Sequence, residues 1–131
     1  MPLILNNRWM LSVKSNKIID LEYRVDTQFL QPEATLIVSF LAENPFIIFS
    51  REQLIYAGWG EAGSNPDFDP TRLGELMKTI SEIFVRLPPG RPYLKFFPRL
   101  GYCLLADVRQ AHSFEHNIEL EDRRGGSLGI K

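Results

Sequence analysis

The chain contains 131 residues, of which 44% are hydrophobic and 24% are charged, and this composition is that of one folded globular domain. No apolar run approaches the ~20 residues that span a bilayer, and no signal peptide opens the chain, so we expect a cytoplasmic protein without a membrane span. One cysteine and two histidines are too few for an internal disulfide or for the usual zinc-binding patterns.

The charges are distributed unevenly along the chain. A net charge of −1 argues by itself against binding to nucleic acid, because phosphate contacts are made by lysine and arginine. Residues 71–105, however, carry six basic and two acidic side chains, whereas residues 21–70 carry two basic and eight acidic ones. This separation predicts a basic face on one side of the molecule and an acidic face elsewhere. The basic group comprises Arg72, Lys78, Arg86, Arg91, Lys95 and Arg99.

Residues 3–26 are expected to form a small antiparallel sheet of three or four short strands. Asn6-Asn7 lies between two apolar segments, which is the pattern of a β-hairpin, and Ser15-Asn16 marks a second turn. Because isolated hairpins are marginally stable, such a sheet needs a helix to cover one face. The expected strands are Leu3–Leu5, Trp9–Val13, Ile18-Ile19 and Tyr23–Val25.

Two short helices are expected next. The first opens at Gln31-Pro32-Glu33, where proline suits the first turn and glutamate favours the positive end of the helix dipole, and it ends at Asn44-Pro45. The second starts at Ser50, which can form a capping box with Gln53, and glycines 58 and 60 stop it. A loop over Gly60–Phe68 then leads to the longest helix. The side chains expected to face inward are Leu36, Ile37, Phe40, Leu41, Leu54, Ile55 and Trp59.

Residues 71–87 predict the best-defined helix of the chain. Asp69 is placed to cap its N-terminus, Pro70 suits the first helical position, and Pro88-Pro89-Gly90 stops it. Its opposite face is free for solvent or for a partner, and it contains Gly74, Glu75, Lys78, Glu82, Val85 and Arg86. The apolar stripe at helical spacing comprises Leu73, Leu76, Met77, Ile80, Ile83, Phe84 and Leu87.

Residues 93–105 switch to a two-residue period and predict a β-hairpin with Arg99 at its tip and Lys95 and Tyr102 on its arms. Its aromatic side chains can either stack on bases or pack within the hairpin, and we expect packing. Past Val108 the periodicity fades. We therefore expect a domain over residues 1–108 and a tail or linker over residues 109–131, which ends in GGSLGIK.

The order of these elements resembles that of a winged helix-turn-helix. The segment SFLAENPFIIFSREQLIYAGWG at 39–60 is similar to the corresponding segment of OmpR/PhoB-type effector domains, and TISEIFVRL at 79–87 and YLKFFPRLGYCL at 93–104 resemble the last helix and the wing of that family. Among its branches the chain looks most like the membrane-anchored ToxR/CadC-like transcriptional regulators. The alternative to a free cytoplasmic protein is therefore the cytoplasmic domain of an inner-membrane regulator. The resemblance covers residues 8–108. It implies an α+β fold, with an N-terminal antiparallel β-sheet, three helices and a C-terminal β-hairpin wing.

The resemblance also implies a bacterial transcription regulator that binds double-stranded DNA. Helix 71–87 would be the recognition helix in the major groove, and the wing at 93–105 would lie at the adjacent minor groove. The family further implies an activator that contacts RNA polymerase through the loop Gly60–Phe68 and that binds DNA as a dimer. The residues implied to contact DNA are Ser50, Arg51, Thr71, Arg72, Glu75, Lys78, Ser81, Lys95, Arg99 and Tyr102.

Several positions depart from the basic pattern of that family. Phe84-Val85 stands where a basic pair is usual, and Leu100 stands where a second basic residue commonly precedes the glycine of the wing. Fewer phosphate contacts would weaken nonspecific DNA binding. The alternative interpretation is a degenerate winged-helix module that acts through protein–protein contacts in a regulatory complex.

No catalytic constellation or cofactor motif can be assembled, so we expect neither enzyme chemistry nor a cofactor. Cys103 has no histidine or aspartate near it in the sequence and is expected to be buried. His112 and His116 have the i, i+4 spacing of a metal pair on a helix, but no third ligand accompanies them.

Overall fold

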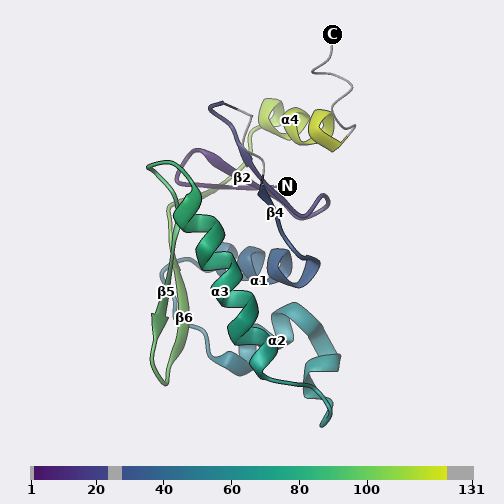
Figure 1. Ribbon diagram of the computed structural model, residues 1–131. Helices are drawn as coiled ribbons and strands as arrows, with labels where there is room; N and C mark the ends of the chain where they lie inside the picture. The colour runs from purple at the N-terminus through teal and green to yellow at the C-terminus, as the bar shows by residue number, and fades with distance from the viewer. Residues whose placement is uncertain (1, 24–27, 124–131) are drawn as a thin grey trace.

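A sheet, a group of helices and a β-hairpin follow one another in the expected order, so the predicted α+β fold is confirmed (Figure 1). The computed structural model describes residues 2–23 and 28–123. The strands are β1 (Leu3–Leu5), β2 (Trp9–Ser12), β3 (Lys17–Asp20), β4 (Gln28–Phe29), β5 (Tyr93–Phe97), β6 (Gly101–Leu105) and β7 (Val108–Gln110). The helices are α1 (Pro32–Glu43), α2 (Arg51–Trp59), the short 3₁₀ helix η1 (Gly60–Ser64), α3 (Thr71–Arg86) and α4 (Ser113–Arg123).

The N-terminal sheet is antiparallel and has the strand order β4-β3-β2-β1-β7. Both predicted turns are confirmed, because Asn6, Asn7 and Asn16 adopt the positive φ angles that tight hairpin turns require of their central residues. The prediction of a fourth strand that begins at Tyr23 is wrong. Tyr23 lies in a turn, residues 24 and 25 lie outside the described residues, and β4 provides the fourth strand instead.

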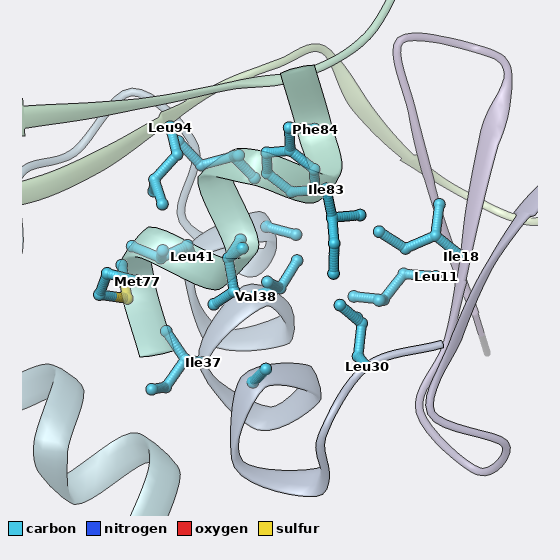
Figure 2. Close-up of a cluster of buried hydrophobic side chains, with 14 of the residues drawn as sticks. Leu11, Ile18, Leu30, Ile37, Val38, Leu41, Met77, Ile83, Phe84 and Leu94 are labelled. Atoms are coloured by element: carbon cyan, nitrogen blue, oxygen red, sulfur yellow. The ribbon is translucent and has the colours of Figure 1, made fainter. Parts of the chain in front are cut away.

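The main core lies between this sheet, α1, α3 and the hairpin β5–β6. Figure 2 shows Leu11 and Ile18 of the sheet pointing towards Ile83 of α3 and towards Leu30, which precedes α1. Leu94 of β5 closes the same cluster from the hairpin side. The sheet is thus covered by helices as its instability in isolation demands.

The second face of the sheet is also covered, and the expectation of three helices followed by a tail needs a correction here. Residues 108–110 add β7 to the sheet edge beside β1, and residues 113–123 form α4. Figure 1 shows α4 on the side of the sheet away from α1. Its Ile118 packs against a separate apolar cluster on that face, made of Ile4, Met10, Ile19 and Ala111. The predicted domain boundary at residue 108 stays a prediction, and residues 124–131, which hold the GGSLGIK end, lie outside the described residues.

Helix α1 is rotated relative to the expected stripe. Ile37 and Leu41 are buried as predicted, but Leu36 is 45% exposed and Phe40 is only half-buried. The small residues Ala34, Thr35 and Ala42 complete the buried face instead, because short side chains permit close packing at positions that a search for large apolar residues overlooks. The helix ends at Asn44 as predicted; the φ of Asn44 is −137°, and the positive φ belongs to Phe46, two residues later.

Asn6 fastens the sheet to the base of the hairpin. Its side-chain amide donates to the carbonyl oxygens of Gly90 and Arg91 at 3.1 and 3.0 Å, and its amide oxygen accepts from the Asp107 N–H at 2.8 Å. The buried Trp9 indole N–H also donates to the Gly90 oxygen, at 3.1 Å. The segments that enter and leave the hairpin are therefore held by one side chain.

Among the described residues, no helix is long and apolar enough to cross a bilayer.

Candidate nucleic-acid interface

Helix α3 begins at Thr71 with Pro70 at the N-cap position, one residue later than the sequence predicts, and Asp69 caps its first turn from the position before Pro70. The Asp69 carboxylate accepts from the Thr71 backbone N–H at 3.0 Å and from the Thr71 hydroxyl at 2.7 Å. These bonds stabilise the carboxylate and hold the pKa of Asp69 below its usual value. Thr71, one of the predicted DNA-contacting residues, thus already uses its hydroxyl within the cap.

The two faces of α3 differ as predicted. All six apolar residues of its stripe within the helix are buried, and Leu87 just after it is buried too. On the opposite face Glu75, Lys78 and Glu82 are exposed, and none of them forms an ion pair with another described residue. Ser81 lies half-buried at the flank. This face is available to a partner along the length of the helix.

Arg72 is held at the flank of α3 by aromatic rings. Its guanidinium carbon lies 5.2 Å from the ring centre of Trp59, at the end of α2, and 5.6 Å from that of Phe68, in the loop. The two rings meet edge to face, with centres 5.1 Å apart. Cation–π contacts of this kind orient a cation without neutralising it. No sequence spacing predicts this stack, because Trp59 is expected in the core and Phe68 in a loop.

The N-terminus of α2 forms the predicted capping box. The Ser50 hydroxyl accepts from the Gln53 N–H at 3.2 Å, and the Ser50 N–H donates to the Gln53 side-chain oxygen at 2.8 Å. Arg51 is exposed beside it. Burial raises the pKa of the Tyr102 phenol, and the Arg51 guanidinium acts in the opposite direction. The backbone bridge between Phe49 and Tyr102 brings Tyr102 to the start of α2, where Arg51 lies.

The wing is joined directly to the start of α2. Phe49 and Tyr102 exchange backbone hydrogen bonds at 2.9 and 3.0 Å, which adds a bridge to the outer side of β6. Gly101 makes this approach achievable, because a β-carbon at that position would lie 1.8 Å from the Phe49 oxygen, and its φ of 137° is one that side chains rarely permit. The tip residue Arg99 also has a positive φ, 69°, and is exposed. Wing and α2 therefore present Arg99 and Arg51 from one connected unit.

The two faces of the wing carry different side chains. Tyr102 shares a face with its cross-strand partner Phe96, and their ring centres are 5.0 Å apart. Lys95 is one residue away and therefore points to the other face, where its ammonium lies 5.1 Å from the Phe97 ring. The structure thus separates the predicted residues Lys95 and Tyr102. The Phe96 ring thus packs against Tyr102 within the hairpin as expected, but Tyr93 and Phe96 stay 57% and 54% exposed.

The remaining candidates give no metal or nucleophile site among the residues that the structure describes. Cys103 is buried as expected, and burial raises the pKa of its thiol. His112 is exposed just before α4, whereas the Nδ1 of His116 lies 3.4 Å from a carboxylate oxygen of the buried Glu119. No group of three potential metal ligands gathers anywhere in the described ranges.

Comparison with known proteins supports the fold through structure alone. No protein-family model and no curated protein sequence matches the chain. Among solved structures, the DNA-binding domain of Escherichia coli CadC superposes with a TM-score of 0.61 at 20% sequence identity. The match covers 85% of this chain and 98% of that one, so nearly the whole of that domain has a counterpart here. The chain therefore has the fold of a winged-helix DNA-binding domain.

Proposed function

We propose that the chain is a transcription regulator that binds double-stranded DNA, as a member of the OmpR/PhoB-type regulators and of their ToxR/CadC-like branch. One observation supports this proposal above the others. The outward face of α3, including Lys78, is uncovered and without ion pairs to described residues, and a wing with an exposed Arg99 stands beside it on the same fold as a DNA-binding domain.

In the proposed complex α3 enters the major groove, because an α-helix fits that groove and can present Lys78, Glu75 and Ser81 to base edges. Arg99 reaches the neighbouring minor groove, where a guanidinium is favoured when the groove is narrow. The backbone N–H groups at the start of α2, with Arg51, bind phosphate oxygens. Arg72 contacts DNA from the flank of α3 while its guanidinium rests on Trp59 and Phe68.

Fluorescence anisotropy with a labelled duplex, at several salt concentrations, tests the proposal. Lys78→Ala and Arg99→Ala should each weaken binding and lower the slope of log affinity against log salt by about 1, because each removes a phosphate or base contact. Lys14→Ala is the matched control, since Lys14 is exposed in the β2–β3 turn. Loss of binding in that control, or no binding at low salt by the folded protein, would contradict the proposal.

The acidic residues on α3 provide a second test. Glu75 and Glu82 flank Lys78 on the same face and should oppose the approach of phosphate. Glu82→Lys is therefore expected to tighten low-salt binding and to increase the salt dependence. If Glu82→Lys changes nothing while Lys78→Ala is also silent, α3 does not face DNA, and the rival interpretation as a protein-binding module is favoured. The 64% exposure of Val85 on that face is the observation that suits the rival.

Activation and dimer formation belong to the same proposal. The loop Gly60–Phe68 exposes the carboxylates of Glu61 and Asp67, which suits a contact with basic residues of RNA polymerase in the cytoplasm. Asp67→Lys should then lower transcription from a target promoter without lowering DNA affinity.

Sedimentation of the chain on duplexes with one or two selected sites measures whether two copies bind together.

A further inference from the structure

An apolar groove runs between α1 and α2, and its Glu52 and Gln53 wall adjoins the α2 N-terminus that we propose to bind phosphate. Its volume is about 560 Å³, and its lining consists of Phe40, Glu52, Gln53, Tyr56 and Ala57. Tyr56 is 60% exposed, and Phe40 is only half-buried. Two helices thus leave aromatic surface uncovered at their junction.

The apolar surface continues along α1 from this groove. Leu36 lies one turn before Phe40 on the same face of the helix and is 45% exposed. The Phe40 ring also contacts the half-buried Phe49, with ring centres 4.6 Å apart. A surface with apolar residues one helical turn apart has the shape that receives an amphipathic helix.

The charges around the groove are all acidic on its α1 side. Helix α1 contains two glutamates and no lysine or arginine, and α2 places Glu52 in the groove wall. Glu33, Glu43 and Glu52 form no ion pair with any described residue. Arg51 is the one basic residue of α2. It lies about 140° around the helix from Tyr56, on the side of the wing residue Tyr102. These carboxylates favour a cationic occupant and disfavour a second copy of the same acidic surface.

We propose that the groove between α1 and α2 is a docking site for a basic amphipathic helix of a partner protein. Large apolar side chains of that helix, one turn apart, fill the groove over Phe40 and Tyr56. Lysine or arginine residues on its flanks pair with Glu43 and Glu52. Phe40 and Tyr56, which would anchor the helix, lie on neither α3 nor the wing and are not among the proposed DNA contacts, so the proposal does not depend on DNA binding.

The test is a selection of helical peptides, randomised along one face in a display library, against the full chain. Enriched peptides should carry apolar residues at i and i+3 or i+4 with lysine or arginine beside them. Amide chemical-shift changes on adding a selected peptide should fall on α1 and α2. Tyr56→Ser and Glu43→Lys should each weaken that peptide about tenfold, which is typical of an aromatic anchor or a complementary charge at an interface.

Two control variants match these changes elsewhere on the surface. Tyr93→Ser removes a tyrosine of similar exposure from the wing, and Glu61→Lys reverses an exposed carboxylate in η1. Neither should affect the peptide, and Tyr56→Ser should leave binding to duplex DNA unchanged. Glu43→Lys is also favourable for folding, because a cation suits the C-terminus of α1.

Four results would overturn the proposal: no enrichment of any peptide, enrichment of acidic peptides, binding that Tyr56→Ser and Glu43→Lys leave intact, or self-association of the chain that Tyr56→Ser abolishes. The last result would identify a second copy as the occupant. Loss of DNA binding in the Lys78→Ala variant with peptide binding intact would separate this surface from the proposed DNA interface.

Discussion

Helices α3 and α4 are both amphipathic, but they use their polar residues in opposite ways. On α3 the charged side chains point outward and make no ion pairs with described residues, while the buried face is purely apolar. On α4 the buried carboxylate of Glu115 receives two bonds of 2.7 Å from the Arg109 guanidinium and one of 2.8 Å from the His112 N–H. Helix α3 is held by apolar contacts, so its charged side chains remain available to a partner. Helix α4 has a smaller apolar face, and its Glu115 carboxylate is used to hold the helix against Arg109.

The largest difference between the two helices should appear when one buried isoleucine of each is truncated. Ile80→Ala in α3 should cost about 3 kcal/mol of global stability, because Ile80 is fully buried at the centre of the main core. Ile118→Ala in α4 should cost about 1 kcal/mol, since that side chain is only partly buried. Urea denaturation followed by Trp fluorescence measures both, and equal losses would mean that α4 is as integral to the core as α3.

Glu115→Gln should have the next largest effect, and it should be local to α4. The neutral amide cannot replace the charged pair with Arg109, so α4 should lose about 2 kcal/mol of its docking energy. Amide hydrogen exchange should accelerate in α4 and remain slow in α3. Faster exchange in both helices to the same degree would show that the two unfold as one unit.

Acid should release α4 before it melts the main core. The Arg109 guanidinium lowers the pKa of Glu115 to about 2 from an ordinary value of 4.5. A carboxyl with a lowered pKa contributes stability that is complete above its ordinary value and that disappears as the pH falls from 4.5 towards 2. Hydrogen exchange of α4 should therefore accelerate across this range, and Glu115→Gln should remove most of that dependence. The pKa of Asp20 is lowered by Arg8 in the same direction, so a residual acid effect is expected at β3.

The smallest effect concerns Gly74, on the uncovered face of α3. A β-carbon at this position would meet no atom within 4 Å. Gly74→Ala should therefore raise stability by about 0.5–1 kcal/mol, because alanine restricts the unfolded chain and favours the helix. Thermal melting measures the gain. If DNA binding weakens in the same variant while stability rises, the backbone of α3 approaches the DNA closely at this residue.

The sequence was sufficient for α3 and insufficient for α4, and the reason is physical. In α3 the apolar stripe, the Asp69 cap and the Pro88-Pro89 stop all indicate the same helix, and each is present in the structure. In residues 113–123 the docking depends on the charged Glu115 as well as on Ile118, so apolar periodicity is too weak there to reveal the helix. The pairing of Arg109 with Glu115 depends on β7 joining the distant strand β1, which is a long-range contact that local patterns do not encode.

The candidate site shows the same limit. The helix, the Ser50 capping box and the hairpin tip at Arg99 follow from local signals and were predicted. The stacking of Arg72 on Trp59 and Phe68 joins three elements across a loop, so no spacing rule could have found it. The contacts of these residues with DNA stay predictions.

The hydrogen bonds of Asn6 to both ends of the hairpin have a consequence for which DNA shapes the proposed complex would favour. Asn6 holds the segments on both sides of the hairpin, and Phe49 is hydrogen-bonded to β6. These bonds restrict rotation of the hairpin relative to the sheet and α2. In the proposed complex the separation between α3 and Arg99 is then a fixed length. Duplexes whose minor groove already lies at that separation bind at low deformation cost, whereas stiffer or wider ones must be bent to fit. Asn6, far from any base, would thereby contribute to the choice of site.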